Sequence, residues 1–445
     1  MKLRRVGLWT VAFAALCLGI ALDAPGAAPP NVIWIWADNL AWGDLHCYGS
    51  GRHETPALDR LAAGGARFTQ FYTAHTICSP ARAALLTGRQ PFRSGIVDVL
   101  YPDSPFGLPA EEITLAELLR GQGYATAAIG KWHLGDRREF LPRQHGFDSY
   151  FGMPLSMDML PAILCRDDDI IEQLPGDKVA GITERYTDEA IRFVTANRER
   201  PFFLYLSHTL PHPPLVLPAR ARHPGATLYA DAVRHLDEQV GRLLEATEKL
   251  GLAGRTLVMF SSDNGPLAEG ADLGPLRGGI NDEHEGGLRV PFIASWPGTL
   301  PAGRVVDVPA ILYDIFPTVA RLAGARLPAD RVYDGQDIWP LLTGRGEFRQ
   351  QRPFIWVYHD NVTTVRDGQW KLHAGRGARR LAKPELYDIE ADAGERRDLA
   401  AQKLEVVARL MKQIEDYRSQ VPKVWQVRYT VRDPAKAGSG LRRHK

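Results

Sequence analysis

The chain has 445 residues, of which 45% are hydrophobic and 24% charged, and this composition excludes a disordered or fibrous protein. It is long enough for one large core and a smaller second unit. Basic and acidic residues nearly balance, 54 against 52, so the charge gives no indication of a nucleic-acid partner.

The N-terminus has the pattern of a secretory signal peptide. Basic residues at positions 2–5 precede an apolar run over residues 6–22, and small residues and prolines follow over 24–30. We predict a signal peptide over residues 1–28, a secreted or periplasmic protein, and no stable membrane insertion after cleavage. The alternative is a retained anchor, because the apolar run approaches the roughly 17 residues that span a bilayer.

Apolar runs bounded by turn residues then alternate with helical segments, which favours an α/β sheet covered by helices on both faces. We predict strands at residues 31–37, 67–72, 124–129, 201–206 and 256–261. We predict helices at residues 55–61, 114–120, 183–197 and 228–250. The polar motifs described below follow strands, at the edge where open α/β sheets bind ligands.

The pattern changes after residues 342–344. Short β-like runs follow at 354–359, 363–365, 370–373 and 386–388, and then a helix at 402–418. We predict a large domain over 29–345, a smaller C-terminal antiparallel unit with a packed helix over 346–430, and a basic tail over 431–445.

Two Asp-Asn pairs end predicted strands. Asp38-Asn39 follows the first strand, and Asp263-Asn264 follows a much later one. Their side-chain oxygens are the ligands that a hard cation such as calcium accepts, and two strand ends would supply four of them at one point. Each pair alone is a weak signal, since Asp and Asn commonly begin turns.

The most informative segment is Cys78-Ser79-Pro80-Ala81-Arg82, which Leu-Thr-Gly-Arg follows at residues 86–89. A lone cysteine is usually a small buried hydrophobic residue. In this context it matches the signal by which sulfatases have a cysteine oxidised to formylglycine. Six further motifs occur in family order: ADNLAWGDLHCYG from Ala37, GKWHLG from Gly130, PHPPL from Pro211, SSDNGP from Ser261, EGGLRVPFIASWPG from Glu285 and ELYDIEADAGERRDLA from Glu385.

The chain therefore resembles the sulfatase family, in its arylsulfatase and N-acetylgalactosamine-6-sulfatase branch, from Asn31 through the C-terminal unit. The resemblance implies an alkaline-phosphatase-like fold, in which helices sandwich a large mixed sheet. It implies hydrolysis of a sulfate monoester of a sugar or aryl alcohol, with a formylglycine-generating enzyme as the partner during maturation. In the implied reaction a hydroxyl of the hydrated formylglycine attacks sulfur, the alcohol leaves, and the second hydroxyl expels sulfate.

The resemblance also implies roles for individual residues. One calcium ion would be held by Asp38, Asn39, Cys78 in its modified form, Asp263 and Asn264. Arg82, one helical turn beyond Cys78, would hold the hydrate, and His133 would help to deprotonate it. His212 would protonate the leaving alcohol, and Lys131 and Ser156 would contact the sulfate. An ammonium and an imidazole two residues apart would share one face if Lys131 and His133 lay in an extended segment.

The sequence departs from the family pattern at two positions. Asn39 stands where relatives usually have a second aspartate, so one negative ligand charge is lost. Ile280 stands where relatives typically carry a lysine that contacts the sulfate, and Arg277, His284 and Arg289 are candidates to replace it.

Three readings of the function follow from these departures: a sulfatase with an altered subsite, a phosphate or phosphonate ester hydrolase of the same superfamily, or a degenerate sulfatase that binds sulfated glycan without turnover. The pairing of Cys47 with Cys165 also stays open, since an export compartment permits one disulfide without requiring it.

Overall fold

The computed structural model describes residues 29–359, 361–377 and 379–421. The predicted signal peptide and basic tail lie outside these residues. Within the described ranges, no helix combines the length and the apolar character that crossing a membrane requires.

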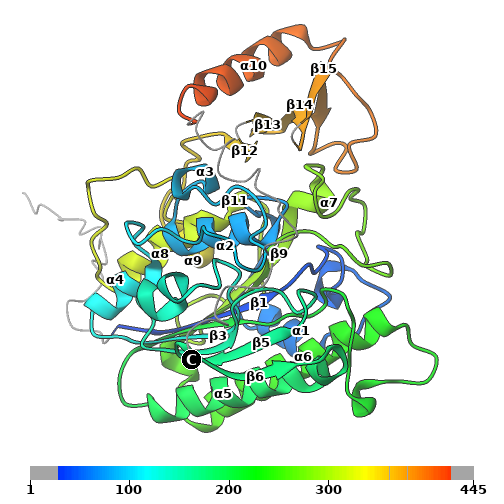
Figure 1. Cartoon of the computed structure of the whole chain (residues 1–445). Coiled ribbons are helices and arrows are strands. Elements are labelled where there is room, and N and C mark those ends of the chain that lie inside the picture. The colour runs from blue at the N-terminus through cyan, green and yellow to red at the C-terminus, as the bar shows by residue number, and fades with distance from the viewer. Residues whose placement is uncertain (1–28, 360, 378, 422–445) are drawn as a thin grey trace, which may run out of the picture.

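The core of the molecule is a mixed sheet of eleven strands (Figure 1). The strands run β10-β2-β9-β8-β1-β7-β3-β4-β5-β6, and β11 pairs with β2. Their bounds are β1 Asn31–Ala37, β2 Ala66–Tyr72, β3 Ala125–Lys131, β4 Ser149–Met153, β5 Ala162–Arg166, β6 Asp169–Leu174, β7 Phe202–Ser207, β8 Thr256–Ser262, β9 Arg289–Ser295, β10 Arg304–Val306 and β11 Ala310–Ile311. The central strands β8, β1, β7, β3 and β4 are parallel, whereas β9 pairs antiparallel with both β8 and β2.

Helices cover both faces of this sheet. Their bounds, with those of the C-terminal unit, are α1 Pro56–Ala63, α2 Cys78–Thr87, α3 Pro91–Ser94, α4 Leu115–Gly121, α5 Ile182–Ala196, α6 Leu228–Lys249, α7 Glu285–Leu288, α8 Ile315–Leu322, α9 Trp339–Thr343 and α10 Leu404–Arg418. Short 3-10 segments lie at His46–Tyr48, Arg138–Phe140, Pro142–His145, Gly176–Gly181, Ala219–Ala221, Ala253–Arg255 and Leu312–Asp314.

The side chains of β1 point alternately to the two faces of the sheet, so helices must cover both faces. Trp34 and Trp36 belong to a buried cluster with residues of α2, α4, α8 and α9. Ile33 and Ile35 point to the opposite face, into a cluster with α1, α5 and α6. Every residue of the strand is buried, as expected for a central parallel strand. The predicted α/β class with a large helix-covered mixed sheet is confirmed.

A separate four-stranded antiparallel sheet forms the C-terminal unit at the top of Figure 1. Its strands are β12 Phe354–Tyr358, β13 Asn361–Asp367, β14 Trp370–Arg376 and β15 Arg379–Asp388. Leu410 and Ile414 of α10 pack into the cluster that contains Val365 and Leu372 of this sheet. The antiparallel unit with a packed helix is therefore confirmed, while the domain boundaries stay a prediction.

Helix α2 carries the cysteine motif into the interior of the molecule, because all ten of its residues are buried. The helix ends at Gly88, whose φ of 68° is left-handed and whose N–H donates to the Ala84 carbonyl. A Cβ at this position would lie 2.6 Å from the Phe316 ring, so only glycine fits there without a shift. This close contact fixes α2 against α8.

Candidate active site

The two Asp-Asn pairs and the cysteine motif meet at the carboxyl ends of the central strands. Ala37 of β1 is in register with Ser262 of β8, which brings Asp38 beside Asp263. Ligand atoms of Asp38, Cys78 and Asp263 lie within 4.8 Å of one another, and all three residues are buried. The Cys78 Sγ is 3.5 Å from Asp38 Oδ1 and 3.6 Å from Asn39 Oδ1.

The asparagines complete this group. Asn39 adopts a φ of 64°, and its N–H donates to Asp263 Oδ1 over 3.1 Å. The Asn264 amide Nδ2 donates to Asn39 Oδ1 at 2.9 Å. Asn264 Oδ1 is buried and has no hydrogen-bond partner in the described part of the chain. A buried oxygen without a donor beside two carboxylates fits a hard divalent cation, since such an ion takes oxygen ligands and would remove the cost of burying that oxygen.

Arg82 lies in the centre of the group. Its Nε and Nη2 donate to Asp263 Oδ2 at 3.1 and 2.7 Å, and Nη2 is 3.7 Å from Asp38 Oδ1. Its Nη1 donates to the Lys131 carbonyl at 3.0 Å and to Ser207 Oγ at 2.5 Å. Burial lowers the pKa of Arg82, but Asp263, together with Tyr205 and Asp38, outweighs it and raises the pKa above its ordinary value. The side chain therefore stays charged and has one fixed orientation.

Lys131 is the last residue of β3 and pairs with the metal-site carboxylate. Its Nζ is 2.7 Å from Asp38 Oδ2, and both side chains are fully buried. Burial alone would raise the pKa of Asp38, but Lys131, His212 and Arg82 together hold it well below its usual range. Lys131 keeps its proton in turn, because Asp38 raises its pKa against the effect of burial.

His133 does not share an extended segment with Lys131, because its φ of 58° turns the chain. Its Nε2 contacts the Leu100 carbonyl at 3.2 Å, and Nδ1 has no partner among the described residues. Since a carbonyl only accepts, Nε2 carries the hydrogen and Nδ1 is the acceptor. Burial, with Lys131 and Arg82 nearby, lowers the pKa of His133 well below its ordinary value, so the ring is neutral.

His212 and Ser156 lie at the border of this group. His212 is 7% exposed, its Nδ1 contacts the Pro213 carbonyl, and it lies near enough to Asp38 and His133 to influence the pKa of both. Ser156 is buried, and its Oγ lacks a hydrogen-bond partner in the ranges that the structure describes. It lines a cavity with Asp103 and Asp136, and Pro154, two residues before it, accepts from the His133 N–H. Among the residues that the structure describes, no hydrogen bond joins the Ser156 hydroxyl to another predicted site residue.

Two further residues of this group were not predicted. Ser207 accepts from Arg82, and Thr73 Oγ1 donates to the Asp263 carbonyl at 2.5 Å. Ser207 ends the apolar strand β7, and its position as the polar end of a buried strand was the signal that would have identified it.

Ile280 lies beside the segment that carries Asp263 and Asn264. Its N–H donates to the Pro266 carbonyl at 2.9 Å, and the next N–H, of Asn281, donates to the Thr76 carbonyl at 3.3 Å. The candidate replacements for the missing lysine have partners elsewhere: His284 binds Asp282 and Arg277, and Arg289 binds Glu285. Cys47 and Cys165 are both free thiols, so they do not pair.

The comparisons with known proteins agree with this arrangement. A family model described as sulfatase matches residues 30–325. Arylsulfatase A of Bos taurus is 40% identical over 403 residues, which cover 82% of this chain and 78% of the relative. N-acetylgalactosamine-6-sulfatase of Mus musculus is 38% identical over 387 residues, covering 80% and 74%.

Solved structures with a similar fold are also known. The structure of Ps i-CgsB in complex with k-i-k-neocarrahexaose has a TM-score of 0.80 and 30% identity, covering 88% of this chain and 94% of that one. The phosphonate monoester hydrolase of Agrobacterium radiobacter shares the fold, with a TM-score of 0.66 at 20% identity, covering 88% and 96%. The relatives that match at 38–40% identity are sulfatases, so the phosphate or phosphonate reading and the non-catalytic reading are not favoured. The chain therefore belongs to the sulfatase family and is a sulfuric ester hydrolase.

Proposed function

We propose that this sulfatase hydrolyses a sulfate ester on a glycan, with a formylglycine formed from Cys78 and one calcium ion. The observation that carries the proposal is the buried group of Cys78, Asp38 and Asp263, together with the unpaired oxygen of Asn264. Sulfatases generally use a formylglycine and a divalent metal, and the residues of this chain fit both.

Four side chains would hold the calcium ion: Asp38, Asn39, Asp263 and Asn264, with position 78 beside them. The ion would supply positive charge to a sulfate oxygen. The formylglycine would supply, as its hydrate, the nucleophilic hydroxyl. The reaction needs these groups because a sulfate ester accumulates negative charge as the bond to the alcohol breaks.

The two histidines would move the protons. His133 has Nδ1 as an acceptor, because Leu100 fixes its other nitrogen as the donor, and it would take a proton from the hydroxyl at position 78. His212 has Nδ1 engaged with the Pro213 carbonyl, which leaves Nε2 to give a proton to the leaving alcohol. The charged Lys131 and Arg82 would bind sulfate oxygens and restrict their orientation. Ser156 would be a further contact to the sulfate.

A glycan is the substrate class that the similar structures favour. One of them is described in complex with k-i-k-neocarrahexaose, and another, with a TM-score of 0.81 at 27% identity, is described in the metabolism of multiple glycosaminoglycans. An exported enzyme would meet such a substrate, so we also propose that residues 1–28 direct the chain to a secreted or periplasmic location. A formylglycine-generating enzyme would convert Cys78 before the protein arrives there.

Mass spectrometry of the Cys78 peptide, from protein made in its own host, tests this proposal together with sulfate release. We expect an aldehyde at position 78, and faster release of sulfate from a sulfated oligosaccharide than from an aryl sulfate. An unmodified thiol in protein that releases sulfate at full rate would overturn the assigned nucleophile. Equal or faster turnover of the aryl ester would overturn the glycan assignment.

A further inference from the structure

The proposed base, His133, takes its orientation from a segment without helix or strand. His133 Nε2 contacts the Leu100 carbonyl at 3.2 Å, and Leu100 lies in the stretch 95–114 between α3 and α4. A backbone outside helices and sheets has no regular ladder of hydrogen bonds, so side chains must satisfy and hold it. The residues that hold Leu100 therefore determine where the acceptor for His133 lies.

Helix α2 supplies the first of these residues. The Leu100 N–H donates to Ser79 Oγ at 3.2 Å, and Ser79 is fully buried directly after Cys78 in α2. Leu100 thus accepts from the base and donates to the neighbour of the nucleophile. This contact fixes one side of the segment to the helix that carries Cys78.

Asp98, two residues before Leu100, holds the segment from the other side. Its Oδ1 accepts from the Val99 N–H at 2.7 Å, and its Oδ2 is 3.0 Å from His359 Nε2. Burial would raise the pKa of Asp98, but His359, the Val99 N–H and His75 outweigh it and lower the pKa below its ordinary value. The carboxylate is therefore ionised and only accepts, so His359 Nε2 is the donor.

His359 belongs to the C-terminal unit and has an unfavourable backbone conformation. It directly follows β12, and its φ of 56° is left-handed, a region that a residue with a Cβ enters at a cost in free energy. Glycine or asparagine would fit this turn with less strain. Strained residues persist where surrounding contacts support them, and here the observed contact is the one to Asp98.

Strand β12 itself contacts the chain at both ends of α2. The Trp356 Nε1 donates to the Thr73 carbonyl at 2.9 Å, before the helix, and the Gln90 Nε2 donates to the Ile355 carbonyl at 2.8 Å, after it. These contacts fix the strand that leads to His359 against the two flanks of the cysteine motif.

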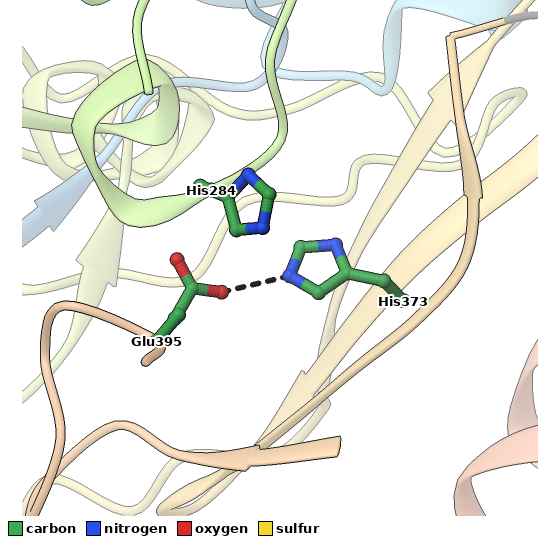
Figure 2. A group of neighbouring side chains, drawn as sticks. All are labelled: His284, His373 and Glu395. Carbon is green, nitrogen blue, oxygen red and sulfur yellow. Dashed lines mark hydrogen bonds and ion pairs between the residues drawn. The ribbon is translucent and has the colours of Figure 1, made fainter. Parts of the chain in front are cut away.

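A buried group of side chains joins the same sheet to the catalytic domain (Figure 2). His284 precedes α7, and its ring lies 4.9 Å from that of His373 on β14, whose Nε2 is 2.7 Å from Glu395 Oε1. Such a group resembles a zinc site, but the Lys371 ammonium lies 3.3 Å from Glu395 Oε1 and would repel a cation. The Glu285 N–H also donates to Glu395 Oε2, at 2.6 Å. The group is therefore a structural connection that holds the sheet in place.

We propose that His359 is a positioning residue for the base His133. It acts through Asp98, which holds the segment whose Leu100 carbonyl accepts the Nε2 hydrogen of the base. The imidazole is thereby kept in the tautomer whose Nδ1 accepts a proton. The inference rests on the proposed function, in which His133 is the base, and adds the C-terminal unit to the catalytic machinery. His359 lies outside residues 30–325, so the family match does not include it.

His359→Gly separates a positioning role from a structural one. Glycine adopts a left-handed φ without strain, so the variant should keep or raise the Tm. We expect kcat for sulfate release to fall about tenfold, with KM within about twofold of wild type, because part of the His133 population takes the wrong tautomer. Mass spectrometry of the Cys78 peptide gives the formylglycine content of each variant, and kcat is expressed per formylglycine.

Three further variants check the route of this effect. His359→Gln keeps a side-chain N–H donor and should recover most of kcat. Asp98→Ala should lower kcat as His359→Gly does, and the double variant should fall no further, because both changes break one contact. His46→Gly is the matched control: it removes an exposed histidine 3.1 Å from Asp59, beside α1, and should leave kcat unchanged.

Nitrogen NMR of protein labelled with 15N-histidine reads the tautomer directly and needs no turnover. The His133 signals are those missing in His133→Gln. Wild type should show hydrogen on Nε2 alone, and the two nitrogen shifts should move toward each other in His359→Gly as the tautomers exchange. Wild-type kcat in His359→Gly, equal falls in the glycine and glutamine variants, or unchanged His133 shifts would overturn the inference. Failure of the proposed function is a separate result: wild-type protein that releases no sulfate from any glycan.

Discussion

The Asn264 Nδ2 donates to Asn39 Oδ1 over 2.9 Å, and the two side chains are neighbours although 225 positions separate them in the sequence. This contact orients the Asn264 amide so that its own Oδ1 is left without a partner among the described residues. Asn39, which departs from the family pattern, therefore fixes the orientation of the Asn264 side chain.

Asn39→Asp is expected to tighten calcium binding, because it adds a charged ligand beside Asp38 and Asp263 while keeping an acceptor for Asn264. We expect the Kd for calcium to fall by about tenfold, an order of magnitude typical of changes in ligand charge. The calcium-free variant should also be less stable, since a third carboxylate is buried at the site. Calorimetry and thermal unfolding with and without calcium measure both effects.

The matched control is Asn197→Asp, at the C-cap of α5. It adds the same charge outside the site and should leave the affinity for calcium unchanged. A Kd for calcium that does not fall in Asn39→Asp would show that position 39 is not a ligand.

Cys78→Ala is expected to abolish turnover and to leave the fold intact. Among the described residues, the Cys78 sulfur makes two long polar contacts, of 3.5 and 3.6 Å, so truncation removes little packing. Steady-state kcat and circular dichroism check the two halves of this prediction. Cys47→Ala, which alters a half-buried free thiol elsewhere, should keep wild-type kcat. Substantial residual turnover in Cys78→Ala would contradict the assigned nucleophile.

Ile280→Lys is expected to raise sulfatase activity or to leave it unchanged. The Ile280 N–H donates to the Pro266 carbonyl, and a lysine there would supply the cation that the family resemblance implies at this position. Such a contact contributes roughly 2 to 4 kcal/mol in the transition state, so the gain in kcat/KM is at most about two to three orders of magnitude. Ile280→Met separates added length from added charge. A large fall in kcat/KM for Ile280→Lys would mean that this isoleucine belongs to a repurposed pocket.

Glu285→Gln is expected to destabilise the protein by about 3 to 5 kcal/mol, as for a buried ion pair that loses one partner. Glu285 Oε1 is 2.8 Å from Lys371 Nζ, and Oε2 is 2.7 Å from Arg289 Nε, all in buried side chains. The free energy of unfolding in urea measures the loss. Glu415→Gln breaks an exposed pair with Arg418 on α10 and should change stability by less than about 1 kcal/mol. A loss in Glu285→Gln as small as in this control would show that the buried ion pairs of Glu285 do not stabilise the protein.

The low pKa of Glu285 predicts that the free energy of unfolding falls at acid pH. Burial would raise the pKa of Glu285, but Arg289, Lys371 and Arg366 outweigh it and hold the pKa far below its ordinary 4.5. Because the pKa is lower in the folded state, the contribution to stability is complete above pH 4.5 and is lost as the pH falls below it. Wild-type stability should therefore decline more steeply below this pH than that of Glu285→Gln. Parallel declines in urea unfolding would contradict this account.

The sequence by itself determined the main elements and the family. Strands such as β1 and β8 are continuous apolar runs, and helices such as α5 and α6 are periodic, so local pattern placed them within a few residues. Short and edge strands such as β10 and β11 were not predicted, since two or three residues carry no periodicity. The cysteine motif and the Asp-Asn pairs were readable because their chemistry lies in consecutive residues.

Only the tertiary structure decided which charges meet. Strand register brings Asp38 to Asp263, and the turn at His133 sends its ring to Leu100 rather than to the side of Lys131. Arg277 and Arg376 both contact His284, although about a hundred residues separate them in the sequence. Local propensity acts over a few residues, whereas these contacts depend on how whole sheets pack, and that packing is set by the shape and burial of surfaces that no short segment contains.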